Sequence, residues 1–347
     1  RVTFPQIPSN NNQLTNGAGY ITSVPPSNKG CNDFNSLPLS SFNFIEKTDI
    51  INGQIQFEDF DPEAINIIWN RRWSSSKLIN KGNEVYYDAL GAQNASALLS
   101  SLRRETGVLR SFLNLNLDNK VWTTRPEKMS ANKIENLEIA KSCNLSVPEY
   151  VITSCKLTLS QFAKRHERII CKPISETPHF TSSIDNNIVE SIILYTKGFT
   201  VDEIEDIPSS FFKSLFQQEI LKEFEIRVFY LCDTCYSMAI FSQNDKQTQL
   251  DFRNYNDEKP NRTVPFNLPK EVEYNVKKFC RKAGYTMGSL DLIKSTDGNY
   301  YFLEINPIGQ FGMVSYPCNY YLEKKLAEHL IGQNEKNKQK RNTKRIV

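Results

Sequence analysis

The segment GSLDLIKSTDGNYYFLEINP, residues Gly288–Pro307, carries the clearest structural signal in the chain. Two apolar runs, Ser289–Lys294 and Tyr300–Asn306, flank the turn sequence Thr296–Asn299. An Asp-Gly pair between two such runs is the strongest short-range signal for a β-hairpin. We therefore predict two antiparallel strands that are joined at this turn.

Three polar side chains gather on this predicted hairpin. Because side chains alternate along a strand, Glu304 and Asn306 point to one face, and Leu303 and Ile305 point to the other. Asp291 can reach the polar face from the paired strand. Two carboxylates and a carboxamide are hard oxygen ligands of the kind that Mg²⁺ prefers. The pattern predicts a magnesium site, although a solvated polar face would have the same residue types.

Two lysines occupy positions that suit phosphate oxygens. Lys172 ends the apolar run Ile169–Pro173, and Lys133 follows Asn132 at the start of a predicted helix. A lysine ammonium acts as a point charge on a phosphate. A single lysine at a strand end is more often an ordinary edge residue. These two lysines therefore indicate phosphate binding only in combination with the polar residues of the hairpin.

A further polar stretch can serve a nucleotide. The short predicted strand Gln217–Leu221 has a polar first half whose backbone can face a purine edge. Glu225 can accept hydrogen bonds from ribose hydroxyls, and Arg227 lies on the same face of a regular strand as a candidate phosphate or acyl-phosphate ligand. The loop that begins at Asp251 adds guanidinium groups at Arg253 and Arg262.

The common nucleotide and hydrolase motifs are missing from the sequence. It contains no GxxxxGK[ST], no GxGxxG between a strand and a helix, no kinase motif set, no GxSxG and no HExxH. Any use of a nucleotide must therefore rest on the lysines and the hairpin.

The order of elements along the chain indicates an α+β protein with antiparallel sheets. The spacing of apolar residues predicts helices over residues 92–112, broken near Gly107, over 130–144, over 270–284 and over 319–331. A short strand is expected at Asn66–Trp69. Residues 1–30 are rich in Asn, Pro, Ser and Gly, so we expect a loop or disorder there.

The net charge of +3 is unevenly distributed. Residues 333–347 hold six basic side chains against one acidic one, a net +5, so residues 1–332 carry −2. We expect this tail to be solvated and disordered, and the folded part has no composition that favours nucleic acid. The chain has no run of about 18 apolar residues, so we expect no membrane span.

The 8 cysteines show no secreted disulfide framework and no zinc spacing. The close pair Cys232 and Cys235 falls at a predicted hairpin turn, and the three histidines do not complete a metal site. Reduced thiols in the cytoplasm fit this pattern.

The ordered set of motifs resembles ATP-grasp ligases over about residues 60–332. The motifs are Asn132-Lys133, Ile170–Pro173, Gln218–Ile220, Glu225–Arg227, Asp251–Arg253, Gly288–Asp291 and Glu304–Pro307. Within that superfamily, the run from Glu304 to Lys325 is similar to peptide maturases of the grasp-with-spasm type, the graspetide or microviridin-like synthetases.

This resemblance implies an α+β ATP-grasp fold in three parts: a pre-ATP-grasp domain at residues 31–125, a central subdomain at 126–215 and a C-terminal antiparallel-sheet subdomain at 216–332. Residues 1–30 depart from the family pattern, and 333–347 form the basic tail. The implied enzyme uses ATP and Mg²⁺, two ions in all. It phosphorylates an Asp or Glu side chain of a ribosomal precursor peptide that carries a leader segment. A Ser or Thr hydroxyl, or a Lys amine, then displaces phosphate to close an ω-ester or ω-amide ring.

The resemblance also implies a role for each candidate residue. The phosphate ligands are Lys133 and Lys172; the adenine hinge is Gln218, Glu219 and Ile220; the ribose ligand is Glu225; the metal ligands are Asp291, Glu304 and Asn306; and the acceptor site is Arg227, Asp251, Arg253 and Arg262. A cytoplasmic location and a homodimer are compatible with the family. Two alternatives stay open: a ligase that adds an amino acid to a carboxylate, as glutamate ligases do, and a non-catalytic peptide-binding module.

Overall fold

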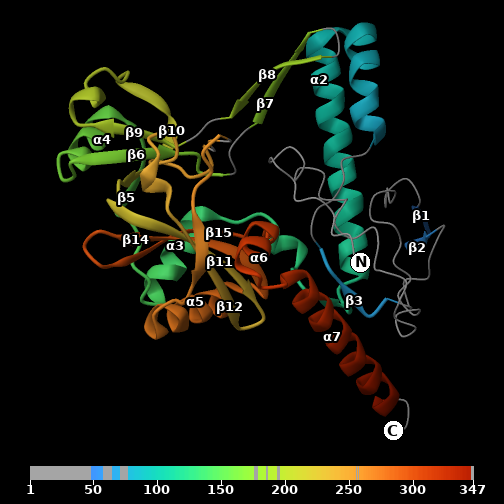
Figure 1. Cartoon of the computed structure of the whole chain (residues 1–347). Coiled ribbons are helices and arrows are strands. Elements are labelled where there is room, and N and C mark those ends of the chain that lie inside the picture. The colour runs from blue at the N-terminus through green and yellow to red at the C-terminus, as the bar shows by residue number, and fades with distance from the viewer. Residues whose placement is uncertain are drawn as a thin grey trace. The chain divides into compact units, whose positions relative to one another are not determined.

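The computed structural model describes residues 48–57, 65–70, 77–175, 179–184, 187–193, 196–254, 256 and 258–344. The prediction for residues 1–30 lies outside these ranges. The chain forms two compact units, one within residues 1–66 and 72–121 and the other within residues 67–71 and 122–347 (Figure 1).

The first unit contains a hairpin and a long helix. Strands β1 (Thr48–Ile51) and β2 (Gln54–Phe57) are antiparallel and turn at Asn52-Gly53, where both φ angles are positive. Helix α2 (Lys77–Asn116) runs for 40 residues and continues through Gly107, so the predicted break is wrong. One interior glycine costs a helix only about 1 kcal/mol, and buried Leu99 and Leu113 hold the helix on either side of it.

A four-stranded antiparallel sheet forms the small lobe of the second unit. Its order is β5 (Tyr150–Cys155), β10 (Ser210–Gln218), β6 (Arg168–Lys172) and β9 (Lys197–Thr200). Helix α4 (Lys156–Ala163) packs on it through Leu159 and Phe162, which contact Ile169 and Phe216 in one apolar cluster. A separate hairpin follows β6, made of β7 (His179–Ile184) and β8 (Asn187–Ile193).

A five-stranded antiparallel sheet forms the large lobe. Its order is β13 (Thr263–Phe266), β12 (Thr234–Ile240), β11 (Lys222–Leu231), β14 (Met287–Ser295) and β15 (Tyr300–Asn306). The predicted hairpin is therefore present as β14 and β15, and the mixed, antiparallel architecture confirms the α+β class. Strands β3 (Ile67–Ile68) and β4 (Val121–Trp122) form a small separate pair.

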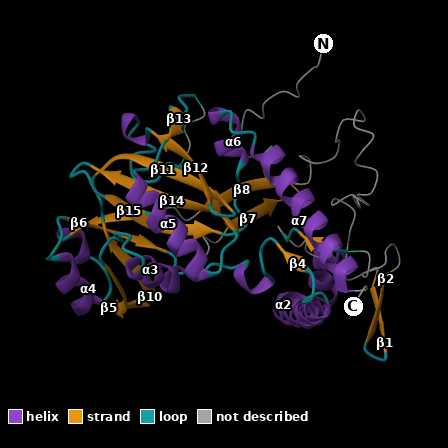
Figure 2. Cartoon of the chain, turned by 90° about the horizontal axis from the view of Figure 1, so that it is seen from below, coloured by secondary structure: helices purple, strands orange, loops and turns teal. Residues whose placement is uncertain are grey.

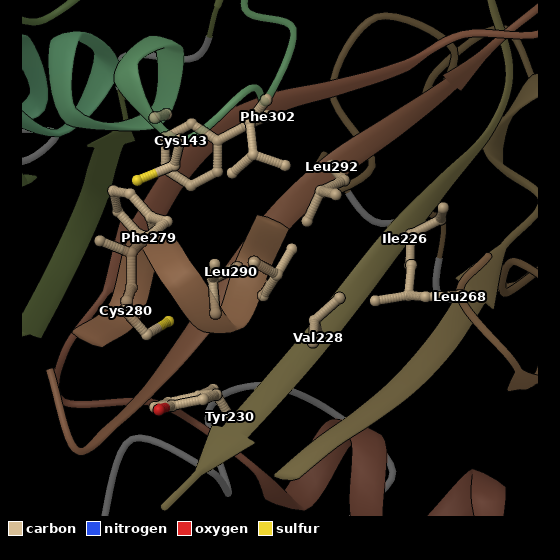
Figure 3. Close-up of a cluster of buried hydrophobic side chains, with 14 of the residues drawn as sticks. Cys143, Ile226, Val228, Tyr230, Leu268, Phe279, Cys280, Leu290, Leu292 and Phe302 are labelled. Atoms are coloured by element: carbon tan, nitrogen blue, oxygen red, sulfur yellow. The ribbon is translucent and has the colours of Figure 1, made fainter. Parts of the chain in front are cut away.

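Helices α3 (Lys133–Ser142) and α5 (Lys270–Ala283) cover one face of the large sheet (Figure 2). Ile226, Val228 and Tyr230 of β11 point to that face and pack with Phe279 of α5 (Figure 3). Asn132 begins α3, and its side chain accepts hydrogen bonds from the backbone N–H groups of the first helical turn, as its sequence context predicts.

The opposite face of β11 changes from apolar to polar along the strand. Phe229 and Leu231 pack under helices α6 (Gly312–Cys318) and α7 (Leu322–Lys344) in a second apolar cluster. Alternation then places Glu225 and Arg227 on the same face, beyond these helices. The uncovered, polar end of this face is where the candidate site lies.

Helix α7 corrects the prediction of a disordered tail. It is 23 residues long and extends to Lys344, so most of residues 333–347 are helical. This stretch contains no Gly or Pro, and its Lys, Gln, Glu and Arg residues have good helix propensity. Extending an existing helix also avoids the cost of nucleation. The described helices include none that is long and apolar enough to cross a membrane.

Candidate active site

Three charged side chains form a row across neighbouring strands of the large sheet. Arg227 of β11 pairs with Asp291 of β14, which in turn pairs with Glu304 of β15. Directly opposed residues present their side chains on one face of a sheet. Arg227 Nη1 donates to both carboxylate oxygens of Asp291, at 2.5 and 2.6 Å. The structure thus brings together two of the predicted metal ligands and one predicted acceptor-site arginine.

Glu304 is the point at which the cations converge. Lys133 Nζ lies 3.3 Å from Glu304 Oε2, and Arg253 Nη1 lies 3.5 Å from Glu304 Oε1. Burial opposes ionisation of this carboxyl, but the charges of Lys133, Lys172 and Arg253 hold its pKa below the usual range. Glu304 therefore stays charged at neutral pH and can serve as a metal ligand.

The two lysines reach the site from different elements. Lys133 is the first residue of α3, and its Nζ also donates to the carbonyl oxygen of Pro173, at 3.3 Å. Lys172 ends β6 in the small lobe. Burial lowers the pKa of Lys172, and the negative charge of Glu304 acts against that shift. A buried ammonium of this kind is stabilised by anionic oxygens, which phosphate groups would supply.

Asp251 and Arg253 form a closed pair in the loop between β12 and β13. Arg253 Nε donates to Asp251 Oδ1 at 2.9 Å, and Nη2 donates to Oδ2 at 2.8 Å. The backbone N–H of Arg253 also donates to Oδ1. Although burial disfavours the charged form, these contacts hold the pKa of Asp251 well below its usual range. The carboxylate is thus ionised at neutral pH, and in this structure it orients the guanidinium plane of Arg253.

A β-bulge alters the face that the sequence predicts for Leu303. Asp291 pairs with Glu304, but Leu292 pairs with Phe302, so Leu303 is an extra residue in β15. Strict alternation places Leu303 on the face opposite Glu304, whereas a bulge breaks that alternation. Leu303 lines the cleft together with Glu304, so it belongs to the site.

The carboxylates and the carboxamide suit a magnesium ion. Asn306 lies opposite Ser289, two residues beyond Glu304, and its Oδ1 accepts the backbone N–H groups of Ile308 and Gly309. The described residues contain no cluster of three or more His, Cys, Asp or Glu side chains that could enclose an ion. Mg²⁺ is commonly held by one or two carboxylates with the remaining ligands from water and substrate phosphates. Asp291 and Glu304, which both line the cleft, fit that arrangement, whereas Asn306 is exposed and does not line it.

Glu225 offers an acceptor for a hydroxyl group. Its side chain is buried, and one oxygen pairs with Lys222 while Oε2 has no hydrogen-bond partner. Burial raises the pKa of Glu225 to about 7, against the opposing charge of Lys222. A buried acceptor without a donor is costly unless a ligand supplies one. The ribose hydroxyls of a nucleotide would do so.

The predicted hinge lies between the two lobes. Gln218 is the last residue of β10, and residues 219–221 then connect the small sheet to β11 of the large sheet. The backbone N–H groups of Gln218 and Glu219 donate to Glu149 and Arg168, at 2.8 and 3.1 Å. Glu219 also forms an ion pair with Arg168 at 2.9 Å. These contacts fix the connection and leave the backbone beyond them beside the cleft.

A cleft lies between the two sheets. Apolar side chains from both lobes and several of the charged groups described above line it. Its lining includes Ile170, Lys172, Gln218, Glu219, Ile220, Glu225, Asp251, Arg253, Asp291, Leu303 and Glu304. An apolar region next to clustered cations and carboxylates can accept an aromatic base with its phosphate groups.

Arg262 does not join this group. Its guanidinium carbon lies 5.3 Å above the ring of Phe241, its side chain is exposed, and it does not line the cleft. The predicted role of Arg262 in the acceptor site is therefore not supported by its position. A cation–π contact with the neighbouring strand accounts for its placement.

Three solved structures resemble the chain over most of its length. Macrocyclase MdnC from Microcystis aeruginosa MRC, bound with precursor peptide MdnA, is 23% identical, with a TM-score of 0.63 over 82% of this chain and 86% of that one. A RiPP-associated ATP-grasp ligase from Chryseobacterium gregarium, in complex with ADP and a leader and core peptide, is 20% identical, with a TM-score of 0.58 over 76% and 77%. ATP-grasp ligase PsnB, complexed with a minimal precursor, is 17% identical, with a TM-score of 0.61 over 85% and 88%.

The chain has the ATP-grasp fold. The fold that the motif order implied is thereby confirmed. No protein-family model and no curated protein matches the sequence. The assignment of the ATP-grasp fold therefore rests on three-dimensional similarity.

Two residues of the cleft have no prediction from the sequence. Lys222 pairs with Glu225 from three positions earlier and also donates to the carbonyl oxygen of Leu250 at 2.9 Å. Thr196 donates to Asp251 Oδ2 at 3.1 Å from a different lobe. The spacing of Lys222 three residues before Glu225 is a weak local signal for their ion pair. Nothing near Thr196 in the sequence indicates its contact with Asp251.

The raised pKa of Glu225 predicts how the stability of this protein depends on pH. The carboxyl titrates near its ordinary value of about 4.3 in the unfolded chain and at about 7 in the native state. The native state binds more protons between these values, so this group makes the free energy of unfolding fall as pH rises through the window. We expect Glu225→Gln to flatten that decline, measured by urea unfolding from pH ~5 to pH ~8.

The matched control is Glu273→Gln, which removes a carboxylate from a partly exposed pair with Lys277 on α5. This variant should keep the wild-type pH profile. If Glu225→Gln and the wild type lose stability in parallel, the assigned pKa of Glu225 is wrong.

Proposed function

We propose that the protein is an ATP-dependent ligase that closes ω-ester or ω-amide macrocycles in a ribosomally made precursor peptide. The observation that carries this proposal is the charged row Arg227–Asp291–Glu304 in an ATP-grasp cleft. Solved structures of similar fold support the peptide substrate, since those proteins are described as macrocyclases or RiPP-associated ligases bound to precursor, leader or core peptides.

The proposed reaction has two steps. A carboxylate oxygen of a peptide Asp or Glu attacks the γ-phosphorus of ATP, ADP leaves, and an acyl phosphate forms. A Ser or Thr hydroxyl, or a Lys amine, then attacks the acyl carbon; inorganic phosphate leaves, and the nucleophile gives up its proton. One ATP becomes ADP and phosphate for each ring, and a difficult condensation is divided into two easier displacements.

The residues of the cleft supply binding and charge in this scheme. Lys133 and Lys172 bind the phosphates, the 218–220 connection faces the adenine, and Glu225 accepts from the ribose. Asp291, Glu304 and Asn306 are the proposed ligands of Mg²⁺, for which we propose two ions. When bound, Mg²⁺ neutralises charge on the phosphate oxygens.

Other proposed features concern the whole protein. They are the three-part division at residues 31–125, 126–215 and 216–332, a surface that binds the leader segment, and a homodimer. A cytoplasmic location is also proposed, and it suits the free thiols of the described cysteines.

Arg253 and Arg227 would orient the acceptor carboxyl and its acyl phosphate. Arginine matches carboxylate and phosphate oxygens with two parallel hydrogen bonds, and a preorganised guanidinium favours the charge that develops on transfer. Asp251 would contribute by holding the Arg253 plane in place.

Mass spectrometry tests this proposal. Candidate precursors are short peptides encoded beside the gene that contain repeated Thr and Asp or Glu. Incubation with the full chain, ATP and Mg²⁺ should lower the peptide mass by about 18 Da per ring, the mass of one water. An increased mass would identify a ligase that adds an amino acid. An unchanged mass, for a peptide shown to bind in the presence of ATP, would support a binding module and overturn the proposal.

A further inference from the structure

A hydrogen bond joins the small lobe to the loop between β12 and β13, which contains Asp251 and Arg253 and is called the acceptor loop below. Thr196 lies just before β9 of the small sheet, and Asp251 lies in the loop between β12 and β13 of the large sheet. Thr196 Oγ1 donates to Asp251 Oδ2 at 3.1 Å. Both residues line the cleft, and Asp251 is buried.

The same loop lies close to the small lobe at a second position. Leu250 precedes Asp251, and its Cδ2 would lie 3.7 Å from a Cβ placed on Gly198 of β9. That Cβ would also lie 2.8 Å from Arg168 Nη2, so β9 approaches its neighbours closely where it has no side chain. From the large lobe, Lys222 Nζ holds the Leu250 carbonyl at 2.9 Å. The loop is therefore anchored to both lobes beside Asp251.

The hydrogen bonds continue from Thr196 to the charged row. Asp251 Oδ2 accepts from both Thr196 and Arg253 Nη2, and Oδ1 accepts from Arg253 Nε. Arg253 Nη1 then lies 3.5 Å from Glu304. The two hydrogen bonds to Asp251 fix one orientation of the Arg253 guanidinium plane. The Thr196 hydroxyl in turn fixes the position of Asp251 Oδ2, the oxygen that accepts from both Thr196 and Arg253. Threonine is suited to this because its branched Cβ restricts χ1.

We propose that Thr196 is a positioning residue: its hydroxyl orients Arg253 through Asp251 when the small lobe closes on the cleft. This inference rests on the proposed ligase function. Contact between Thr196 and Asp251 requires the β9 segment to lie against the acceptor loop. An open cleft would release Asp251 and with it the orientation of Arg253. The hydrogen bond thus links closure of the small lobe over the nucleotide to the orientation of Arg253 that phosphoryl transfer requires.

Kinetics of the full chain test this role through Thr196→Val, which removes the hydroxyl and keeps the branched shape. We expect kcat for ADP formation with ATP, Mg²⁺ and peptide to fall about tenfold, the effect of losing one hydrogen bond to a charged group. The KM for ATP should change less than about threefold, because the hydroxyl acts on Arg253 and not on nucleotide binding. Thr196→Ser should recover most of the activity.

A matched control and a double-mutant cycle separate positioning from a general structural effect. Thr200→Val removes a hydroxyl from the other end of β9, where Thr200 contacts exposed Glu203, and should leave kcat unchanged. In an Asp251→Asn background, Thr196→Val should have little further effect, because both changes break the same chain of contacts. Wild-type kcat in Thr196→Val, or full additivity with Asp251→Asn, would overturn the role.

Failure of the proposed function has a different signature. If the wild type forms ADP without lowering the mass of any precursor, the macrocyclisation is wrong, and the Thr196 comparison is then made on ADP formation alone. Thr196→Val could also unfold at a lower temperature than the other variants. In that case the kinetics of Thr196→Ser and the double-mutant cycle with Asp251→Asn are measured below that temperature, and they still distinguish a positioning role from a general structural one.

Discussion

Glu304→Gln should reduce ATP turnover by about a thousandfold, the largest single effect we expect in this protein. The side chain keeps its size but loses the charge at which Lys133 and Arg253 converge, at 3.3 and 3.5 Å. The three cations around it, Lys172 included, would then repel one another with less compensation from neighbouring carboxylates. One of the two proposed carboxylate ligands of Mg²⁺ would also be neutral. Steady-state ADP formation at saturating Mg²⁺ measures the loss.

Binding measurements complete this experiment. Mn²⁺ titration followed by electron paramagnetic resonance should show weaker ion binding in Glu304→Gln with ATP present, while a bound precursor peptide should be retained. The control is Glu328→Gln on α7, which removes only an exposed contact with Lys324 at 3.9 Å. If Glu304→Gln keeps turnover within about tenfold of the wild type, the assignment of Glu304 to the metal site is wrong.

Arg253→Lys should lower kcat by about a hundredfold although the positive charge is retained. The guanidinium makes two parallel contacts with Asp251, at 2.9 and 2.8 Å, and points a third nitrogen toward Glu304. A lysine ammonium cannot reproduce this planar fork. Loss of orientation acts on the transition state, so the KM for ATP should change little.

Kinetic parameters and acyl-phosphate trapping with hydroxylamine measure this effect, since less hydroxamate should form per unit time. Arg281→Lys is the control, because Arg281 makes exposed contacts outside the cleft, with Asp233 at 3.5 Å and with the carbonyl oxygen of Lys277 at 3.3 Å. A raised KM for ATP with an unchanged kcat would contradict the proposed role and would make Arg253 a ground-state ligand of the nucleotide.

Local sequence patterns predicted those parts of the site that depend on neighbouring residues. The Asp-Gly turn and two apolar runs predicted the β14–β15 hairpin, and alternation placed Glu304 and Asn306 together on it. The sequence also predicted a helix start at Asn132 and Lys133, and in the structure Asn132 is the N-cap that precedes Lys133. These signals are short-range, because backbone geometry and capping involve residues only a few positions apart.

Patterns of the same kind failed where long-range packing sets the outcome. Alternation assigned Leu303 to the wrong face because a bulge against β14 interrupts it. Composition predicted a disordered tail, but α7 continues to Lys344. Arg262 has the same chemistry as Arg253 and lies on the same loop, yet it stacks on Phe241 away from the cleft.

From its sequence alone, the protein could be assigned the residue types of an ATP-grasp site and their order along the chain, since strand period and turn chemistry are encoded locally. Burial of Glu225, the convergence of cations on Glu304 and the contact of Thr196 with Asp251 arise only in the folded chain. Thr196 and Asp251 are 55 positions apart and belong to different sheets. Strand register and the closing of two lobes create such contacts, and neither has a periodic signature in the sequence.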